Sequence, residues 1–152
     1  MQALNLPNYP KKLSVIKGKL MIFDRVRVKN VILTPEEWVR QHFINYLVTE
    51  KKYPQERIAN EVTVSLKNTS HRCDTVVYNQ YLEPIVIIEY KAPSVPVTRE
   101  VFEQITRYNI CLHVGLLIVT NGLEHYCCRI HEDGSTYSYL KEIPEYGEIV
   151  RP

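Results

Sequence analysis

Residues 73–91 read CDTVVYNQYLEPIVIIEYK, which is two apolar runs joined by a short polar segment. This pattern predicts two antiparallel strands, and a turn at the centre of the polar segment would place Asp74 opposite Glu89. Side chains alternate along a strand, so Glu89 and Lys91 should share a face with Asp74. Because like charges placed opposite each other destabilise a sheet, the two carboxylates require a compensating cation.

A hard divalent ion with oxygen ligands is the natural candidate for that cation. Asp74 and Glu89 can bind Mg²⁺ or Mn²⁺, and the carbonyl of Tyr90 lies where it could supply a third oxygen. Phosphodiester hydrolysis also needs a positive group near the developing charge, and Lys91 can provide it. The alternative is a cross-strand salt bridge on an exposed face. The surrounding apolar residues disfavour it, because charges are costly in a covered strand.

The flanking sequence predicts a mixed sheet covered by helices. A helix begins after Thr34, which is a good N-cap; Pro35 suits the first helical position and Glu37 would complete a capping box. Thr98 can cap a second helix that runs to about His113. Strands are expected at residues 61–66, 115–120, 124–130 and 136–140, with one or two more in 13–33, broken at 17–19 and 29–30. A meander, a crossover helix and a buried strand imply an α/β (α+β) fold with extra strands at both ends.

Length and composition are those of one globular domain. The chain has 152 residues and a mass of 17.9 kDa, and we expect residues 13–152 to form the domain and residues 1–12 a loose surface segment. No signal peptide and no apolar run of about 20 residues occurs, which excludes a membrane span and favours a cytoplasmic location. The four cysteines form no CxxC pair, and no Cys or His spacing supports a zinc site.

The formal net charge of +2 is small, but the basic residues are unevenly distributed. Residues 11–29 hold seven of them against a single acid, Asp24. Such a segment can follow a phosphate backbone, and it can equally be a strand edge protected by charge. The residues that would position DNA are Lys17, Lys19, Arg25, Arg27 and Lys29.

The acidic pattern resembles a known nuclease superfamily. Asp74 followed by Glu89-x-Lys91 at the end of an apolar strand resembles the PD-(D/E)xK superfamily, although Arg72-Cys73 replaces the proline of the motif. The resemblance implies a restriction-endonuclease-like core in the order helix, three strands, helix, strand. Residues 104–108, QITRY, match the QxxxY element of the RecB-like branch. A spacing of four places Gln104 and Tyr108 on one helical face.

Five ordered segments are similar to the N-terminal nuclease domain of type I restriction enzyme R subunits. They are LTPEEWVRQHFINYL, HRCDTVVYN, IIEYKAP, QITRYN and LIVTNGLEHYCC, and the similarity extends over residues 22–145. The resemblance implies Mg²⁺- or Mn²⁺-dependent cleavage of DNA by Asp74, Glu89 and Lys91, supported by Gln104 and Tyr108. Other restriction-system subunits are the implied partners. The sequence has no GxxxxGK[ST] phosphate loop, so we expect a free-standing nuclease, one served by separate chains, or a domain that kept the site while its biological role changed.

Several alternatives stay open at this stage. Glu37 can join the metal site or only cap its helix, and Glu61, which begins a core strand, can face the acidic patch or serve only the fold. The same fold can also form a non-cleaving DNA-binding or assembly module, or a structural domain with an internal salt-bridge cluster. Eleven tyrosines leave room for a homo-oligomer with an aromatic interface.

Overall fold

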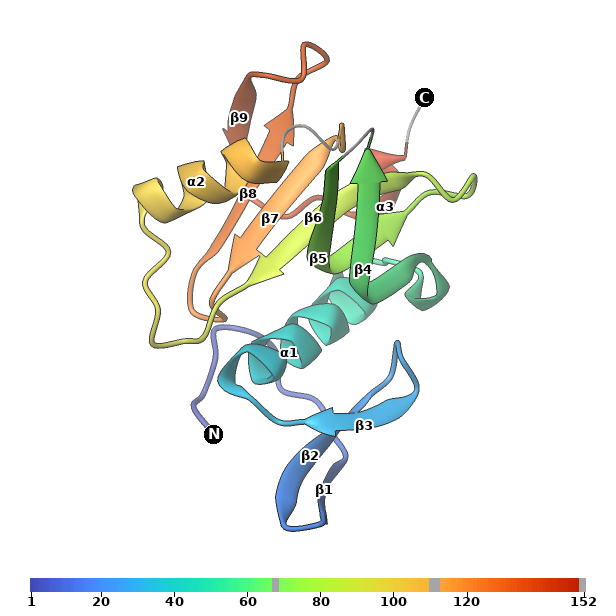
Figure 1. The fold of residues 1–152 in the computed structure, drawn as a ribbon, viewed down its shortest axis with the longest axis vertical. Helices are drawn as coiled ribbons and strands as arrows, with labels where there is room; N and C mark the ends of the chain where they lie inside the picture. Colours follow the sequence, from blue (N-terminus) through green and yellow to red (C-terminus); the bar gives the residue numbers. More distant parts are fainter. Residues whose placement is uncertain (67–68, 110–112, 151–152) are drawn as a thin grey trace.

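The computed structural model describes residues 1–66, 69–109 and 113–150, and within these the side chains of residues 66, 69 and 107–109 are not described. The described residues form two sheets and three α-helices (Figure 1). A three-stranded antiparallel sheet contains β1 (Leu13–Ile16), β2 (Lys19–Asp24) and β3 (Lys29–Ile32). The helices are α1 (Pro35–Glu50), α2 (Arg99–Asn109) and the short α3 (Tyr146–Ile149), and a 3-10 turn, η1 (Gln55–Arg57), precedes the main sheet.

The main sheet has six strands in sequence order: β4 (Ile58–Leu66), β5 (Thr69–Tyr78), β6 (Pro84–Tyr90), β7 (Leu116–Thr120), β8 (His125–Ile130) and β9 (Tyr137–Leu140). β6 and β7 are parallel because α2 connects them, and the other neighbouring strands are antiparallel. The predicted mixed sheet is confirmed. The sequence Asn68-Thr69-Ser70 also predicts a turn between β4 and β5. Residue 68 lies outside the described residues, and Thr69 and Ser70 belong to β5.

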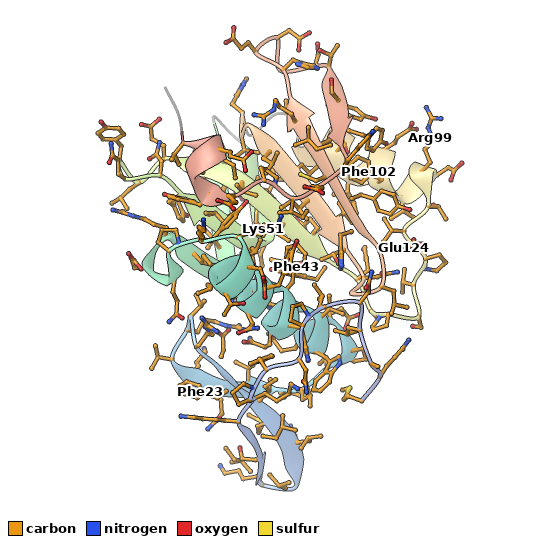
Figure 2. The ribbon with its side chains drawn as sticks, turned by 180° about the vertical axis from the view of Figure 1, so that it is seen from behind. Phe23, Phe43, Lys51, Arg99, Phe102 and Glu124 are labelled. Carbon is orange, nitrogen blue, oxygen red and sulfur yellow. The ribbon has the colours of Figure 1, made fainter. Side chains whose placement is uncertain are left out.

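Each face of the main sheet carries its own apolar core. On one face Phe43 and its neighbours from α1 pack against alternate residues of β5–β8, such as Val86 and Ile88. On the other face Phe102 of α2 packs against the intervening residues, such as Ile87. Figure 2 labels Phe43 on α1 and Phe102 on α2. The sheet is therefore the middle layer between two helices, and its central strands β6 and β7 are apolar on both faces, as their sequences indicate.

Both helices begin where the sequence predicts. The main-chain amide of Glu37 donates to Oγ1 of Thr34 at 3.1 Å, and the amide of Val101 donates to Oγ1 of Thr98 at 3.2 Å. These side chains satisfy amides that have no partner inside the helix. The second helix, predicted to run to about His113, is described as far as Asn109, and residues 110–112 lie outside the described part of the chain. No helix among the described residues is long and apolar enough to cross a membrane.

The basic segment departs from the prediction in where its strands break. The first break, at Lys17-Gly18, is as expected, but the second lies at residues 25–28 and Lys29-Asn30 belongs to β3. The carboxylate of Asp24 accepts hydrogen bonds from the amides of Val26 and Arg27 and so closes the turn early. The three strands form a separate small sheet on the outer side of α1, as Figure 1 shows, and do not extend the main sheet.

The N-terminal segment, predicted to be loose, has defined partners. The amide of Asn5 donates to the carbonyl of Gly122 at 2.8 Å, and Trp38 Nε1 donates to the carbonyl of Gln2 at 2.9 Å. Leu4 and Leu6 pack against the core on the α1 face. Leu4 and Leu6 are separated by one residue within a polar segment that contains prolines. Two leucines in such a segment do not form a periodic pattern from which their burial could be predicted.

Candidate active site

The register of β5 and β6 brings the two predicted metal ligands together. Thr75 pairs with Ile88 and Val76 with Ile87, so the next position along the ladder holds Asp74 and Glu89. This is the predicted register. A shift between Val77 and Tyr78 disturbs only the far end of the hairpin, toward its turn.

Asp74 and Glu89 form a close acidic pair. The amide of Tyr90 donates to Oδ2 of Asp74 at 2.9 Å, which turns the Asp74 carboxylate toward β6. Burial, then the negative charge of Asp74 and a hydrogen bond to it, raise the pKa of Glu89, and the positive charge of Lys91 opposes this rise. A raised carboxyl pKa means that the surroundings do not neutralise the ionised pair. The pair is therefore the candidate site for a cation.

Glu61 is the third acid of the same row, but it is already neutralised. Asn60 pairs with Thr75 and Val62 with Cys73, so Glu61 lies beside Asp74 on the side opposite Glu89. Its carboxylate accepts from Arg40 at 2.8 Å and from Arg72 at 2.9 Å. Burial alone would raise the pKa of Glu61, but these two arginines hold it below its ordinary value. The positive φ of 57° at Glu61 marks a local strain of the strand at this row.

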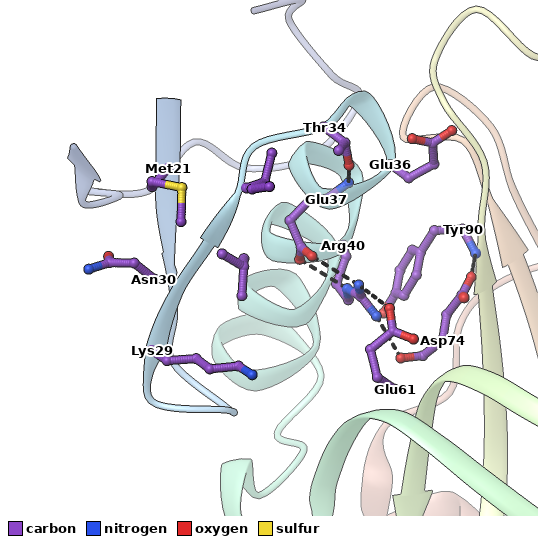
Figure 3. A pocket seen from close by; sticks show the side chains of 12 residues that line it. Met21, Lys29, Asn30, Thr34, Glu36, Glu37, Arg40, Glu61, Asp74 and Tyr90 are labelled. Atoms are coloured by element: carbon purple, nitrogen blue, oxygen red, sulfur yellow. Dashed lines mark hydrogen bonds and ion pairs between the residues drawn. The ribbon is translucent and has the colours of Figure 1, made fainter. Parts of the chain in front are cut away.

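Glu37 has three partners that the capping prediction did not include. Its carboxylate accepts from Arg27 and Arg40, both at 2.9 Å, and from Gln41 at 2.9 Å. In a capping box, the Glu37 side chain would accept a hydrogen bond from the Thr34 amide, and these contacts replace that bond. The other bond of the box, from the Glu37 amide to the Thr34 side chain, is formed. Figure 3 shows Glu37, Glu61 and Asp74 on the walls of one cavity of about 540 Å³, between β3, the start of α1 and strands β4–β6.

The remaining predicted catalytic residues are Lys91, after β6, and Gln104 and Tyr108, on α2. Lys91 follows β6 directly, and its amide is fixed by the carbonyl of Thr120 at 2.9 Å. Its charge acts on Glu89. Gln104 is exposed on α2. Tyr108 belongs to α2, but its side chain lies outside those described, so its predicted role stays a prediction.

The basic residues of the N-terminal sheet fall into two groups. Lys17, Lys19 and Lys29 are exposed, and Lys29 borders the cavity that contains Asp74. Arg25 donates to Gln55 Oε1 at 2.7 Å and to Asn45 Oδ1 at 3.1 Å. Arg27 pairs with Asp24 and Glu37. The lysines are thus free to meet a phosphate backbone, whereas the arginines connect the small sheet to its neighbours.

Arg40 is the residue of this site that sequence reasoning missed. It lies three positions after Glu37 on α1, and that spacing places the two on one face. The guanidinium is buried among Glu37, Glu61 and Tyr90 (Figure 3). Hydrogen bonds to the two glutamates keep the Arg40 pKa well above its ordinary value, despite burial. The sequence signal that could have identified Arg40 was its position, as a charged residue, on a helical face whose other residues are mostly buried.

The donor set fits a hard divalent ion with few protein ligands. Two adjacent carboxylates and the Tyr90 carbonyl suit Mg²⁺, which is commonly bound through one or two carboxylates and keeps several waters. Among the described residues, no group of three or more His, Cys, Asp or Glu side chains is arranged to hold a metal. The three described cysteines are buried and their pKa values are raised, chiefly by burial, to about 11 for Cys73 and Cys128 and to about 12 for Cys127. They are therefore inert thiols.

Three comparisons place the chain among known proteins. The family model described as type I restriction enzyme R protein N terminus matches residues 35–144. A search of curated proteins finds no match. A solved fragment described as an HsdR subunit of a type I restriction enzyme from Vibrio vulnificus YJ016 is similar in fold, with a TM-score of 0.53 and 19% identity. The similarity covers 77% of this chain and 24% of that one.

The expected restriction-endonuclease-like α+β fold is confirmed. Because the family model matches well over half of the residues, the chain belongs to the type I restriction enzyme R protein N-terminus family.

Proposed function

We propose that the protein is a metal-dependent DNA nuclease of the PD-(D/E)xK superfamily, in its RecB-like branch. The observation that carries the proposal is the Asp74–Glu89 pair. Two carboxylates lie side by side in a covered sheet, and the raised pKa of Glu89 indicates that they lack a neutralising charge. Asp74 lies on β5 and Glu89 lies near the end of β6, two residues before Lys91. Membership of the type I restriction enzyme R protein N-terminus family also supports the proposal.

The proposed roles follow from position and charge. Asp74, Glu89 and the Tyr90 carbonyl would hold Mg²⁺ or Mn²⁺, which when bound lowers the pKa of water and polarises a phosphate. Lys91 would stabilise the negative charge that develops on the phosphate. The Lys17, Lys19 and Lys29 side chains would meet the phosphate backbone without reading bases. Gln104 and Tyr108 would support the site from α2, and other subunits of a restriction system are the proposed partners.

The direct test is DNA cleavage with Mg²⁺ or Mn²⁺ by the wild type and by Asp74→Ala and Lys91→Ala. Cleavage should require the metal and should fall by at least about 100-fold in both variants. Glu83→Ala is a suitable control, because Glu83 is an exposed acid in the β5–β6 turn. Cleavage that is undiminished in both site variants would refute the proposal.

A non-cleaving DNA-binding module is the second candidate. It is favoured by the absence, among the described side chains, of any metal-ligand group with three or more members. It predicts DNA affinity that falls steeply with salt, no cleavage with any divalent ion, and little loss of binding in Glu89→Ala. Cleavage by the wild type that is lost in Glu89→Ala would exclude it.

A further inference from the structure

We infer that Arg40 is a positioning residue for the candidate metal site. It holds the main chain of Asp74 so that the Asp74 carboxylate stays beside Glu89. The inference deepens the proposed function and rests on it for the role of the acidic pair. The contacts of Arg40 are independent of that role.

Arg40 connects one helix with three neighbouring strands. Its Nη1 donates to the main-chain carbonyl of Asp74 on β5 at 2.7 Å. Its Nη2 donates to Glu61 on β4 at 2.8 Å, and Nε donates to Glu37 on α1 at 3.0 Å. The guanidinium carbon lies 5.8 Å from the centre of the Tyr90 ring on β6. Figure 3 shows this arrangement with Arg40 at its centre.

The hydrogen-bond donors of Arg40 are almost fully used inside the protein. A guanidinium has five N–H groups. Four are engaged, because Nη2 donates to both Glu37 and Glu61, Nε donates to Glu37, and Nη1 donates to Asp74. The side chain is only 9% exposed. Arg40 is therefore suited to support the site and not to bind a DNA phosphate.

The contact with Asp74 has a direct consequence for the acidic pair. Arg40 fixes the Asp74 carbonyl, and the side chain of the same residue accepts from the Tyr90 amide at 2.9 Å. Hydrogen bonds thus connect Arg40 on α1 to Asp74, and Asp74 to Tyr90, the residue after Glu89. Lysine would keep the charge of Arg40, but it lacks the planar fork that reaches both the carbonyl and the two glutamates.

Amide hydrogen exchange separates positioning from a general role in folding. In Arg40→Lys, without metal, protection of the Tyr90 amide should fall by about tenfold or more, because its acceptor Asp74 is released. The neighbouring Lys91 amide, bonded to the carbonyl of Thr120, should keep its protection within about threefold. Equal losses at both amides, or no loss at either, would overturn the inference.

Two further variants keep this comparison decisive. Arg72→Gln removes the other, more exposed partner of Glu61 and should leave both amides unchanged. If Arg40→Lys does not fold, the triple variant Glu37→Gln, Arg40→Met, Glu61→Gln removes the buried charges together, and the same difference between the two amides is expected.

Calorimetry with MnCl2 on the full chain supplies the second readout. Loss of a supporting contact commonly weakens a metal site by about 10–100-fold, and Arg40→Lys should raise the Mn²⁺ dissociation constant by about tenfold or more. An unchanged dissociation constant would overturn the inference. If the wild type binds no Mn²⁺, the proposed function fails, and the amide comparison alone decides the role of Arg40.

Discussion

At the residue scale, the three acids of one sheet row differ because their neighbours differ. Glu61 has Arg40 and Arg72, and its pKa is lowered, whereas Glu89 has Asp74 beside it and its pKa is raised. Groups whose environments separate their pKa values in this way are typical of functional sites. The pair Asp74–Glu89 could be predicted from the sequence because it depends on the register of one hairpin. The contacts of Arg40 with Asp74 and Glu61 could not be predicted, because these two residues lie on strands distant from α1 in sequence.

Because the pKa of Glu89 is raised, we predict that ionisation of Glu89 destabilises the folded protein at neutral and alkaline pH. Between the ordinary value of 4.5 and the folded-state pKa, the folded protein binds more protons than the unfolded chain, so stability falls as pH rises through this range. Glu89→Gln cannot ionise and should raise the free energy of unfolding at pH 8 by about 1–3 kcal/mol, with a smaller gain near pH 4. Urea unfolding at both pH values measures this. Glu83→Gln, on an exposed residue, should change little, and a Glu89→Gln protein no more stable than wild type at pH 8 would contradict the assignment.

The same shift gives a pH dependence for metal binding. A metal binds the ionised carboxylate, so binding must displace a proton from Glu89 wherever that group is protonated. The affinity for Mn²⁺ should therefore rise with pH above the ordinary carboxyl range, and calorimetry in buffers of different ionisation enthalpy should detect proton release. Metal binding with no proton release and no pH dependence between pH 5 and pH 8 would show that Glu89 is not a ligand.

At the element scale, the helices and the main sheet follow from local signals. Thr34 and Thr98 cap the two long helices as predicted, and apolar periodicity locates the six strands of the main sheet. The turn at residues 25–28 was missed, since it depends on a side chain, Asp24, that binds the following amides. The placement of the small sheet against α1 could not be predicted from the sequence either, because it depends on contacts such as that between Arg27 and Glu37.

The cap of α1 is expected to carry measurable stability. Thr34→Ala removes the acceptor for the Glu37 amide and should lower the free energy of unfolding by about 1 kcal/mol. Thr34→Ser keeps a hydroxyl at the same position and should restore most of that loss. Equal stabilities of the alanine and serine variants in urea unfolding would argue against the cap.

At the scale of the whole molecule, the N-terminal segment closes over the end of the main sheet. Gly122 has a φ of +86°, and an added Cβ would come within 2.8 Å of Leu4. The polar composition of residues 1–12 concealed this packing, because it concerns two leucines and a turn more than 100 residues away.

Gly122→Ala should therefore destabilise the protein by about 1–3 kcal/mol, through backbone strain and displacement of Leu4. Gly115→Ala is the matched control: a Cβ there meets no atom within 4 Å, and its stability should change by less than about 1 kcal/mol. Thermal unfolding of both variants measures the difference, and two equal melting temperatures would count against this packing.

The distribution of basic residues predicts how DNA affinity depends on salt. Replacing Lys17, Lys19 and Lys29 together by alanine should weaken DNA binding and reduce the salt slope by about 0.9 for each lysine that contacts a phosphate. Replacing the exposed residues Lys52 and Lys141 should have little effect. Titrations in EDTA, where no cleavage occurs, measure both, and an unchanged slope in the triple variant would remove the small sheet from the DNA interface.

The assignment of Asp74 and Glu89 as metal ligands can be decided by anomalous diffraction from crystals soaked in MnCl2. A peak between the two carboxylates, with oxygen–metal distances near 2.1 Å and the Tyr90 carbonyl in reach, is the result that we predict. A structure at the same Mn²⁺ concentration with no peak at this pair, or with Lys91 or Arg40 in ion pairs that neutralise both carboxylates, would contradict the metal site.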